Sequence, residues 1–167
     1  MLDATILAND LDNVLSDFMQ NQDTSNQQLF LSEFSKAIDN HFQLAIPSML
    51  NVDIKPASGT LNIPASGSNP ANATIISTAI SNYFAMCITP TGIPQAGVIT
   101  LVVNTAASII PTLTADILSL IGKTQSVGYS DFAKKVIDNV KQITWTVTET
   151  LPTTPPSPMI FPNITLS

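Results

Sequence analysis

The sequence predicts an α+β fold in which amphipathic helices are combined with short β segments and an extended, proline-rich C-terminal arm. Three observations support this class. Apolar residues recur at helical spacing near the start of the chain, for example at Leu7, Leu11 and Phe18. Residues 143–150 alternate between apolar residues and Thr, which is typical of a strand with one buried face. Five prolines among the last sixteen residues exclude a helix or a central strand there.

These patterns divide the chain into three parts. Residues 1–24 are expected to form an acidic helix and a linker, and residues 25–150 an α+β domain. Residues 151–167 are expected to form the extended arm. A length of 167 residues suits one domain with such additions, and it is enough to bury one core.

The first half of the chain is expected to begin with two helices and a short β region. The stripe that starts at Leu7 predicts a helix over about residues 3–20. A second stripe predicts a helix from about Leu29 that ends near Pro47. Alternating segments at 52–54 and 61–63 then predict a hairpin or two extended pieces.

The second half is expected to alternate between helices and strands. An apolar stripe from Ile76 to Cys87 predicts a helix, which Thr89 to Pro94 interrupts. The β-branched run at 97–104 predicts a buried strand. A helix at 109–121 and a helix capped by Ser130-Asp131 should precede the strand at 143–150, whose buried face should carry Ile143, Trp145 and Val147.

A short repeat links two of the predicted helices. Residues 34–42 align with residues 76–84 at an offset of 42, with identical Ser, Ala, Ile, Asn and Phe. Each copy is followed by a proline and then by an extended segment. A duplicated helix-and-strand unit explains the match, and so does the similarity of any two amphipathic helices in a low-complexity alphabet.

Composition and charge exclude several classes of function. The chain has a net charge of −6 and no Arg, which argues against nucleic-acid binding because phosphates require a basic face. One Cys excludes an internal disulfide framework. Residues 56–115 contain no charged side chain, and one domain of this size cannot bury sixty consecutive residues. We therefore expect a partner to cover part of this stretch.

Candidate catalytic and metal-binding residues do not form a recognisable site. His41 is the only imidazole and lies beside the apolar stripe of its helix, so it is expected to be a boundary residue. Cys87 lies on an apolar helix face without a cationic neighbour. The acidic residues Asp10, Asp12 and Asp17 fit a solvated helix face and not a calcium loop. We therefore expect no enzyme activity, no metal and no cofactor.

One helix resembles a pattern found in minor virion proteins of tailed bacteriophages. The pattern is Phe34-Ser-x-Ala-Ile-Asp-Asn-x-Phe42, preceded by a short acidic helix and followed by low-charge segments rich in Thr, Ser, Asn and Pro. The resemblance covers about residues 28–105. It implies a non-enzymatic structural subunit of a head–tail connector, tail or baseplate, located in the virion and assembled in the host cytoplasm. Its implied partners are copies of itself and other virion proteins.

The bottom-up pattern agrees with a role in assembly, through uncharged β surface and the apolar arm. We expect the arm to lie across a neighbouring copy, with no nucleic-acid, membrane or small-molecule partner. Two alternatives remain, a monomeric binding module for an apolar ligand or glycan and a membrane-associated protein built on residues 98–121. The predicted subunit contacts are Val98, Ile99, Leu101, Val103, Met159, Ile160, Phe161 and Ile164.

Overall fold

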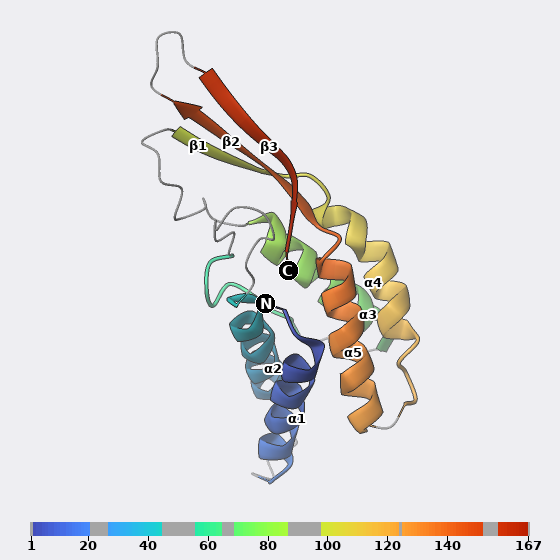
Figure 1. The fold of residues 1–167 in the computed structure, drawn as a ribbon. Helices are drawn as coiled ribbons and strands as arrows, with labels where there is room; N and C mark the ends of the chain where they lie inside the picture. Colours follow the sequence, from blue (N-terminus) through green and yellow to red (C-terminus); the bar gives the residue numbers. More distant parts are fainter. Residues whose placement is uncertain are drawn as a thin grey trace.

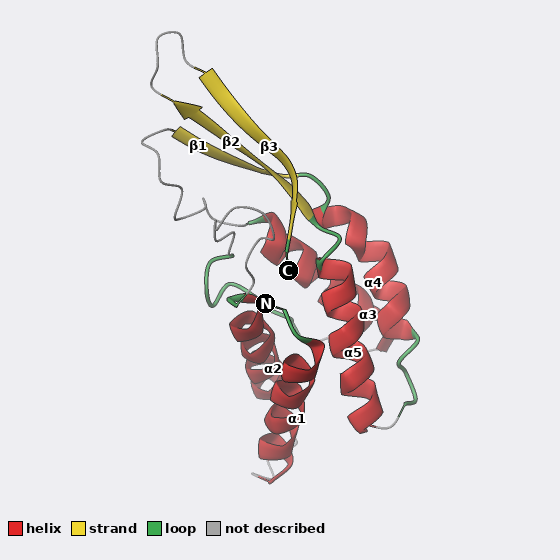
Figure 2. Ribbon diagram, viewed as in Figure 1, coloured by secondary structure: helices red, strands yellow, loops and turns green. Residues whose placement is uncertain are grey.

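The structure of the chain is a computed structural model that describes residues 2–20, 27–44, 56–64, 69–86, 98–123, 125–151 and 157–166. Within these ranges a bundle of helices carries a three-stranded antiparallel sheet that projects away from it (Figures 1 and 2). The predicted α+β class is therefore confirmed. The elements are α1 (Ala4–Gln20), α2 (Gln27–Phe42), α3 (Asn69–Ala85), β1 (Val98–Val103), a 3-10 turn η1 (Ala106–Ser108), α4 (Ile109–Leu118), α5 (Gln125–Val140), β2 (Thr144–Leu151) and β3 (Ser157–Thr165).

The helices pack in a pattern that the apolar stripes explain. Helix α1 contacts α2 and α5, while α4 contacts α3 and α5. Leu7 and Leu11 of α1 are fully buried, as the stripe predicts. The helix begins at a side-chain cap, because Asp3 Oδ1 accepts a hydrogen bond of 2.7 Å from the Thr5 N–H. The N–H of Ile6 donates to the same oxygen, and these two backbone hydrogen bonds are the main reason that the pKa of Asp3 lies below its usual value.

An aromatic cluster connects the helical bundle to the sheet. The rings of Phe42 on α2 and Phe84 on α3 are 4.8 Å apart between centroids. Phe84 also meets Trp145 of β2 at 6.1 Å, in an edge-on arrangement. All three side chains are fully buried. The base of the sheet therefore shares its core with the helices.

The sheet has the order β1-β2-β3, with β2 in the centre. Its buried face is the one that the alternation predicts, since Trp145 and Val147 are fully buried and the intervening Thr residues are partly exposed. Ile143, the first residue of the predicted strand, is also buried but lies just before β2. Glu149 continues the buried face and is 2% exposed.

The C-terminal arm is extended, as expected, but its partner is β2 of the same chain. Strand β3 pairs with β2 from Ser157 to Thr165, and the register shifts between Trp145 and Val147. Pro162 lies at this β-bulge, where an unpaired residue is tolerated. Because β3 is an edge strand, it needs hydrogen bonds on one side only, so it can contain prolines and still form a strand.

Other parts of the sequence prediction differ from the structure. Helix α4 ends at Leu118 and not at Ile121. Helix α5 begins at Gln125, so Ser130 and Asp131 lie inside the helix and do not cap it. Tertiary contacts are made near this end of the helix, where Asp131 pairs with Lys123 and Tyr129 packs against Phe34. Residues 61–63 form no strand, although Leu61 and Ile63 are buried and Asn62 is exposed. Residues 52–54, Cys87 and the break at 89–94 lie outside the described residues.

The two copies of the repeat bury equivalent positions. Ser35 and Ser77 are both buried, and so are Ile38 and Ile80. The last aromatic positions of the two copies are the ring pair that joins α2 to α3. The extended segment after the first copy lies outside the described residues, so the correspondence concerns the helices.

Candidate functional site

The two edges of the sheet are different surfaces. The Thr144 N–H donates to Thr105 Oγ1 at 2.9 Å, and the Thr144 carbonyl accepts from the Asn104 N–H at 2.8 Å. The N–H and C=O groups of Thr144 therefore point toward β1. Along a strand, the backbone N–H and C=O groups of successive residues point alternately toward the two neighbouring strand positions. It follows from the register that the backbone groups of Ile99, Leu101 and Val103 point to the outer side of β1.

The outer side of β1 has the properties of an open strand edge. Among the described residues, β1 pairs only with β2. Its sequence, VITLVV, contains no proline and no charge. On the opposite edge, the register directs the backbone of Pro158 outward, and Pro162 lies at the bulge. Prolines at an edge remove the donors that an added strand needs, so β3 is protected and β1 is not.

One face of the sheet is also uncovered. Val102 on β1 is 51% exposed and Ile160 on β3 is 61% exposed. They lie opposite Thr146 and Thr148 of β2, on the face that carries the Thr residues. The three strands contain one charged residue, Glu149, and it is buried on the other face. The exposed part of the described sheet is therefore free of charge.

The structure places the predicted contact residues on the two outer strands of this sheet. Val103 is half-buried and packs against the core, while Ile160 is exposed. Ile164 is 1% exposed and belongs to the chain's own core, so we leave it out of the proposed contact surface. The side chains of the remaining contacts lie outside those that the structure describes, namely Val98, Ile99, Leu101, Met159 and Phe161.

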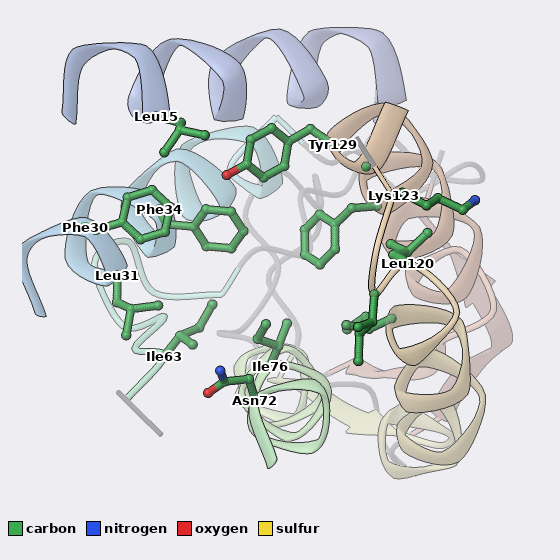
Figure 3. A pocket seen from close by; sticks show the side chains of 14 residues that line it. Leu15, Phe30, Leu31, Phe34, Ile63, Asn72, Ile76, Leu120, Lys123 and Tyr129 are labelled. Carbon is green, nitrogen blue, oxygen red and sulfur yellow. The ribbon is translucent and has the colours of Figure 1, made fainter. Parts of the chain in front are cut away.

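A separate cavity of about 540 Å³ opens among the helices (Figure 3). None of its lining residues belongs to the sheet. It is lined by side chains from all five helices, from the segment at 56–64 and from the residues that follow α4. Most of the lining is aliphatic or aromatic, and includes Leu15, Phe30, Phe34, Ile76, Ile117 and Phe132. Such a volume and lining are typical of a site for a small apolar molecule.

The polar groups of this cavity carry no free charge. Lys123 Nζ lies 2.5 Å from Asp131 Oδ2, and its side chain points away from the cavity in Figure 3. The Lys123 hydrogen bond is the main cause that lowers the pKa of the Asp131 carboxyl. Burial, assisted by the nearby negative charge of Asp12, raises the pKa of Tyr129 above its usual value. Tyr129 is therefore a neutral phenol at neutral pH.

A buried polar cluster joins α2 to α3. Asp39 is 3% exposed, and its carboxylate accepts hydrogen bonds from the Tyr83 hydroxyl and from the Gly59 N–H, the latter at 2.7 Å. Gln43 donates to the Tyr83 hydroxyl at 2.9 Å and to the Pro56 carbonyl at 3.1 Å. The left-handed φ of +77° at Gly59 lets the turn present its N–H to Asp39. This cluster has the character of a structural clasp, because its polar groups satisfy one another.

His41 is a second buried polar anchor. It is 1% exposed, and its Nε2 accepts a hydrogen bond of 3.1 Å from the Asp3 N–H. Burial disfavours the imidazolium and holds the pKa of His41 below its usual value, although Asp10 and Asp3 act in the opposite direction. The imidazole therefore fastens the start of α1 to α2.

The described residues contain neither a metal-binding cluster nor a membrane-spanning helix. No group of three His, Cys, Asp or Glu side chains lies close enough to hold a metal ion in that part of the chain. None of the helices described has the length and apolarity that crossing a bilayer requires.

Sequence reasoning missed the cavity and the polar cluster because both combine distant segments. Asp39 and Tyr83 are 44 residues apart, and periodicity assigns each only to a helix. One signal was available: a Gly at position 128 within an amphipathic helix indicates a packing or functional reason. No protein family, curated protein or solved structure matches this chain.

Proposed function

We propose that the chain is a non-enzymatic structural subunit of the virion of a tailed bacteriophage, in the head–tail connector, the tail or the baseplate. It acts through contacts with copies of itself and with other virion proteins, and it is assembled in the host cytoplasm. The observation that carries the proposal is the uncharged sheet with its open β1 edge.

The chemistry of the sheet supports an interface. A soluble surface normally carries charges of both signs, which keep proteins apart in solution. The exposed face of this sheet offers Val102, Ile160 and a row of Thr side chains instead. An added strand would satisfy the outward backbone groups of β1, and the neighbouring apolar side chains would leave water at the same time.

A matched pair of substitutions tests the proposal. Val102→Lys and Ile160→Lys each place one charge on the open face, but at opposite edges of the sheet. Both native side chains are more than half exposed, so both variants should fold. We expect the wild type to sediment as an oligomer, Val102→Lys as a 17.8 kDa monomer and Ile160→Lys as an oligomer.

Circular dichroism is the folding control for this experiment. It should show the same helix content in the three proteins, which separates loss of assembly from loss of folding. If both variants become monomers, the open face and not the β1 edge makes the contact. A wild type that remains monomeric at high micromolar concentration overturns self-assembly.

A further inference from the structure

The helical cavity opens to the surface of the bundle, and its lining is mostly apolar. Concave apolar surface of this kind is typical of small-molecule sites. Here about 540 Å³ remains between Leu15 on α1, Phe34 on α2 and Phe132 on α5. This volume lies within the range of about 300–1,000 Å³ that small-molecule sites occupy.

Gly128 is one reason that the cavity is open. This residue lies in the first turn of α5 and lines the cavity. A Cβ placed on Gly128 would have no atom within 4 Å, so no neighbour requires a glycine there. Gly lowers the stability of a helix relative to Ala, because its backbone loses more conformational freedom on folding. The chain therefore keeps a helix-weakening residue at the position where a side chain would enter the cavity.

The charge pattern defines what the cavity can accept. Lys123 is the only charged residue in the described lining, and its ammonium is already paired with Asp131. A carboxylate or phosphate in the cavity would thus lack a free cation, and a cationic ligand would lack an anion. The remaining polar groups are the Asn72 amide and the Tyr129 hydroxyl, which can hydrogen-bond to a hydroxyl or carbonyl group.

We propose that this cavity is a binding site for a neutral, largely apolar small molecule that carries one hydroxyl or carbonyl group. The inference does not depend on the assembly function, because the cavity and the sheet share no residue. Binding would remove the Leu, Ile and Phe side chains of the lining from water, at about 25 cal/mol per Å² of apolar surface.

The test uses 1-decanol, sodium decanoate and decyltrimethylammonium as probes, with calorimetric titration of the full chain. We expect saturable binding of 1-decanol and at least tenfold weaker binding of both ions. Gly128→Leu should place a side chain in part of the cavity and weaken 1-decanol binding at least tenfold. Gly128→Ala is the matched control, since it improves the helix in the same way but adds one methyl group, and it should retain binding.

A second variant tests the charge argument. Asp131→Asn releases Lys123 from its ion pair, so decanoate should bind several-fold more tightly while 1-decanol binding stays the same. Thermal unfolding of each variant separates lost binding from lost folding. The proposal is overturned if the wild type binds no 1-decanol saturably or if Gly128→Leu binds it unchanged. A Gly128→Leu variant that changes the oligomeric state instead would assign the cavity to a protein segment.

Discussion

The helical bundle and the sheet differ in how they treat charge and polar groups. In the bundle, the partly buried carboxylate of Asp116 pairs with Lys135, and buried polar atoms such as those of Asp39 have partners within the chain. The sheet has one charged residue, which is buried, and exposes Val102 and Ile160 on its open face. The cluster around Asp39 thus pairs its polar groups within the chain, whereas the sheet exposes apolar side chains, and β1 pairs on one side only among the described residues.

The charge-free stretch of the sequence contributes to both the bundle and the sheet. Residues 56–115 include α3 and most of α4, which bury Ile80, Phe84 and Leu113 in the core. The same stretch also supplies β1, which reaches the surface. Within the described part of this stretch, a lack of charge therefore accompanies both buried helix faces and a strand that reaches the surface.

The largest effect should come from the junction of the two regions. Phe84→Ala removes a fully buried ring that contacts Phe42 and Trp145, and it should lower the free energy of unfolding by about 3–5 kcal/mol. Trp145, the only tryptophan, reports on the sheet by fluorescence, while circular dichroism reports on the helices. We expect both signals to change in one transition, because the regions share a core. Separate transitions would show that the sheet folds independently.

Ile6→Ala is the control for this substitution. Ile6 is 48% exposed on α1, so its removal should change the free energy of unfolding by no more than about 0.5 kcal/mol.

A change in pH should have an intermediate effect on the free energy of unfolding. The responsible group is His41, which lies in the helical bundle. Burial lowers the pKa of His41 below 6.5, so the unfolded chain binds the proton more readily. The stabilisation is complete above about pH 6.5 and is lost as the pH falls through the folded-state pKa. Protonation also places a proton on Nε2, which now accepts from the Asp3 N–H. Chemical denaturation should show a loss on the order of 1–2 kcal/mol between pH 8 and pH 5.

His41→Gln separates this group from the others. The Asp3, Asp116 and Asp131 carboxyls have lowered pKa values, so their contributions are lost only below about pH 3.8. The variant should therefore be less stable at pH 8 but almost independent of pH between 5 and 8. A wild-type stability that is flat over this range would contradict the proposed role of His41.

The smallest effect should come from the surface charges of the bundle. Lys135 Nζ lies 2.6 Å from Asp116 Oδ1 with both side chains 29% exposed, and Lys135→Ala should cost about 1 kcal/mol. Lys36 pairs with Glu33 at 3.6 Å and is 67% exposed, so Lys36→Ala should cost less than about 0.5 kcal/mol. Thermal unfolding at low and high salt measures both. Equal losses would mean that partial burial does not strengthen the Lys135 pair.

The sequence was sufficient for features that depend on local periodicity. The stripe of α1 and the two faces of β2 were predicted correctly, because each element buries one side against a single core. Element boundaries were less accurate where tertiary contacts extend a helix, as they do at Gln125. The prolines of the arm excluded a central strand, but the strand's partner depends on register, and register needs the folded sheet.

The candidate sites were harder to predict for a physical reason. The cavity requires five helices to meet, and local spacing does not fix how helices cross. Three of the predicted contacts can be placed, and they differ: Ile160 is exposed, Val103 is half-buried and Ile164 is in the core. All three are apolar, so hydrophobicity alone could not separate the surface positions from the core position.

The difference between the two edges of the sheet also limits how many strands can be added to it. A sheet with two open edges can add strands at both sides and grow into an endless ribbon, as amyloid does. With Pro158 and Pro162 on β3, the described part of this sheet has an edge without proline only at β1. Strand pairing between two copies would use up both open edges and stop there, so such growth is self-terminating.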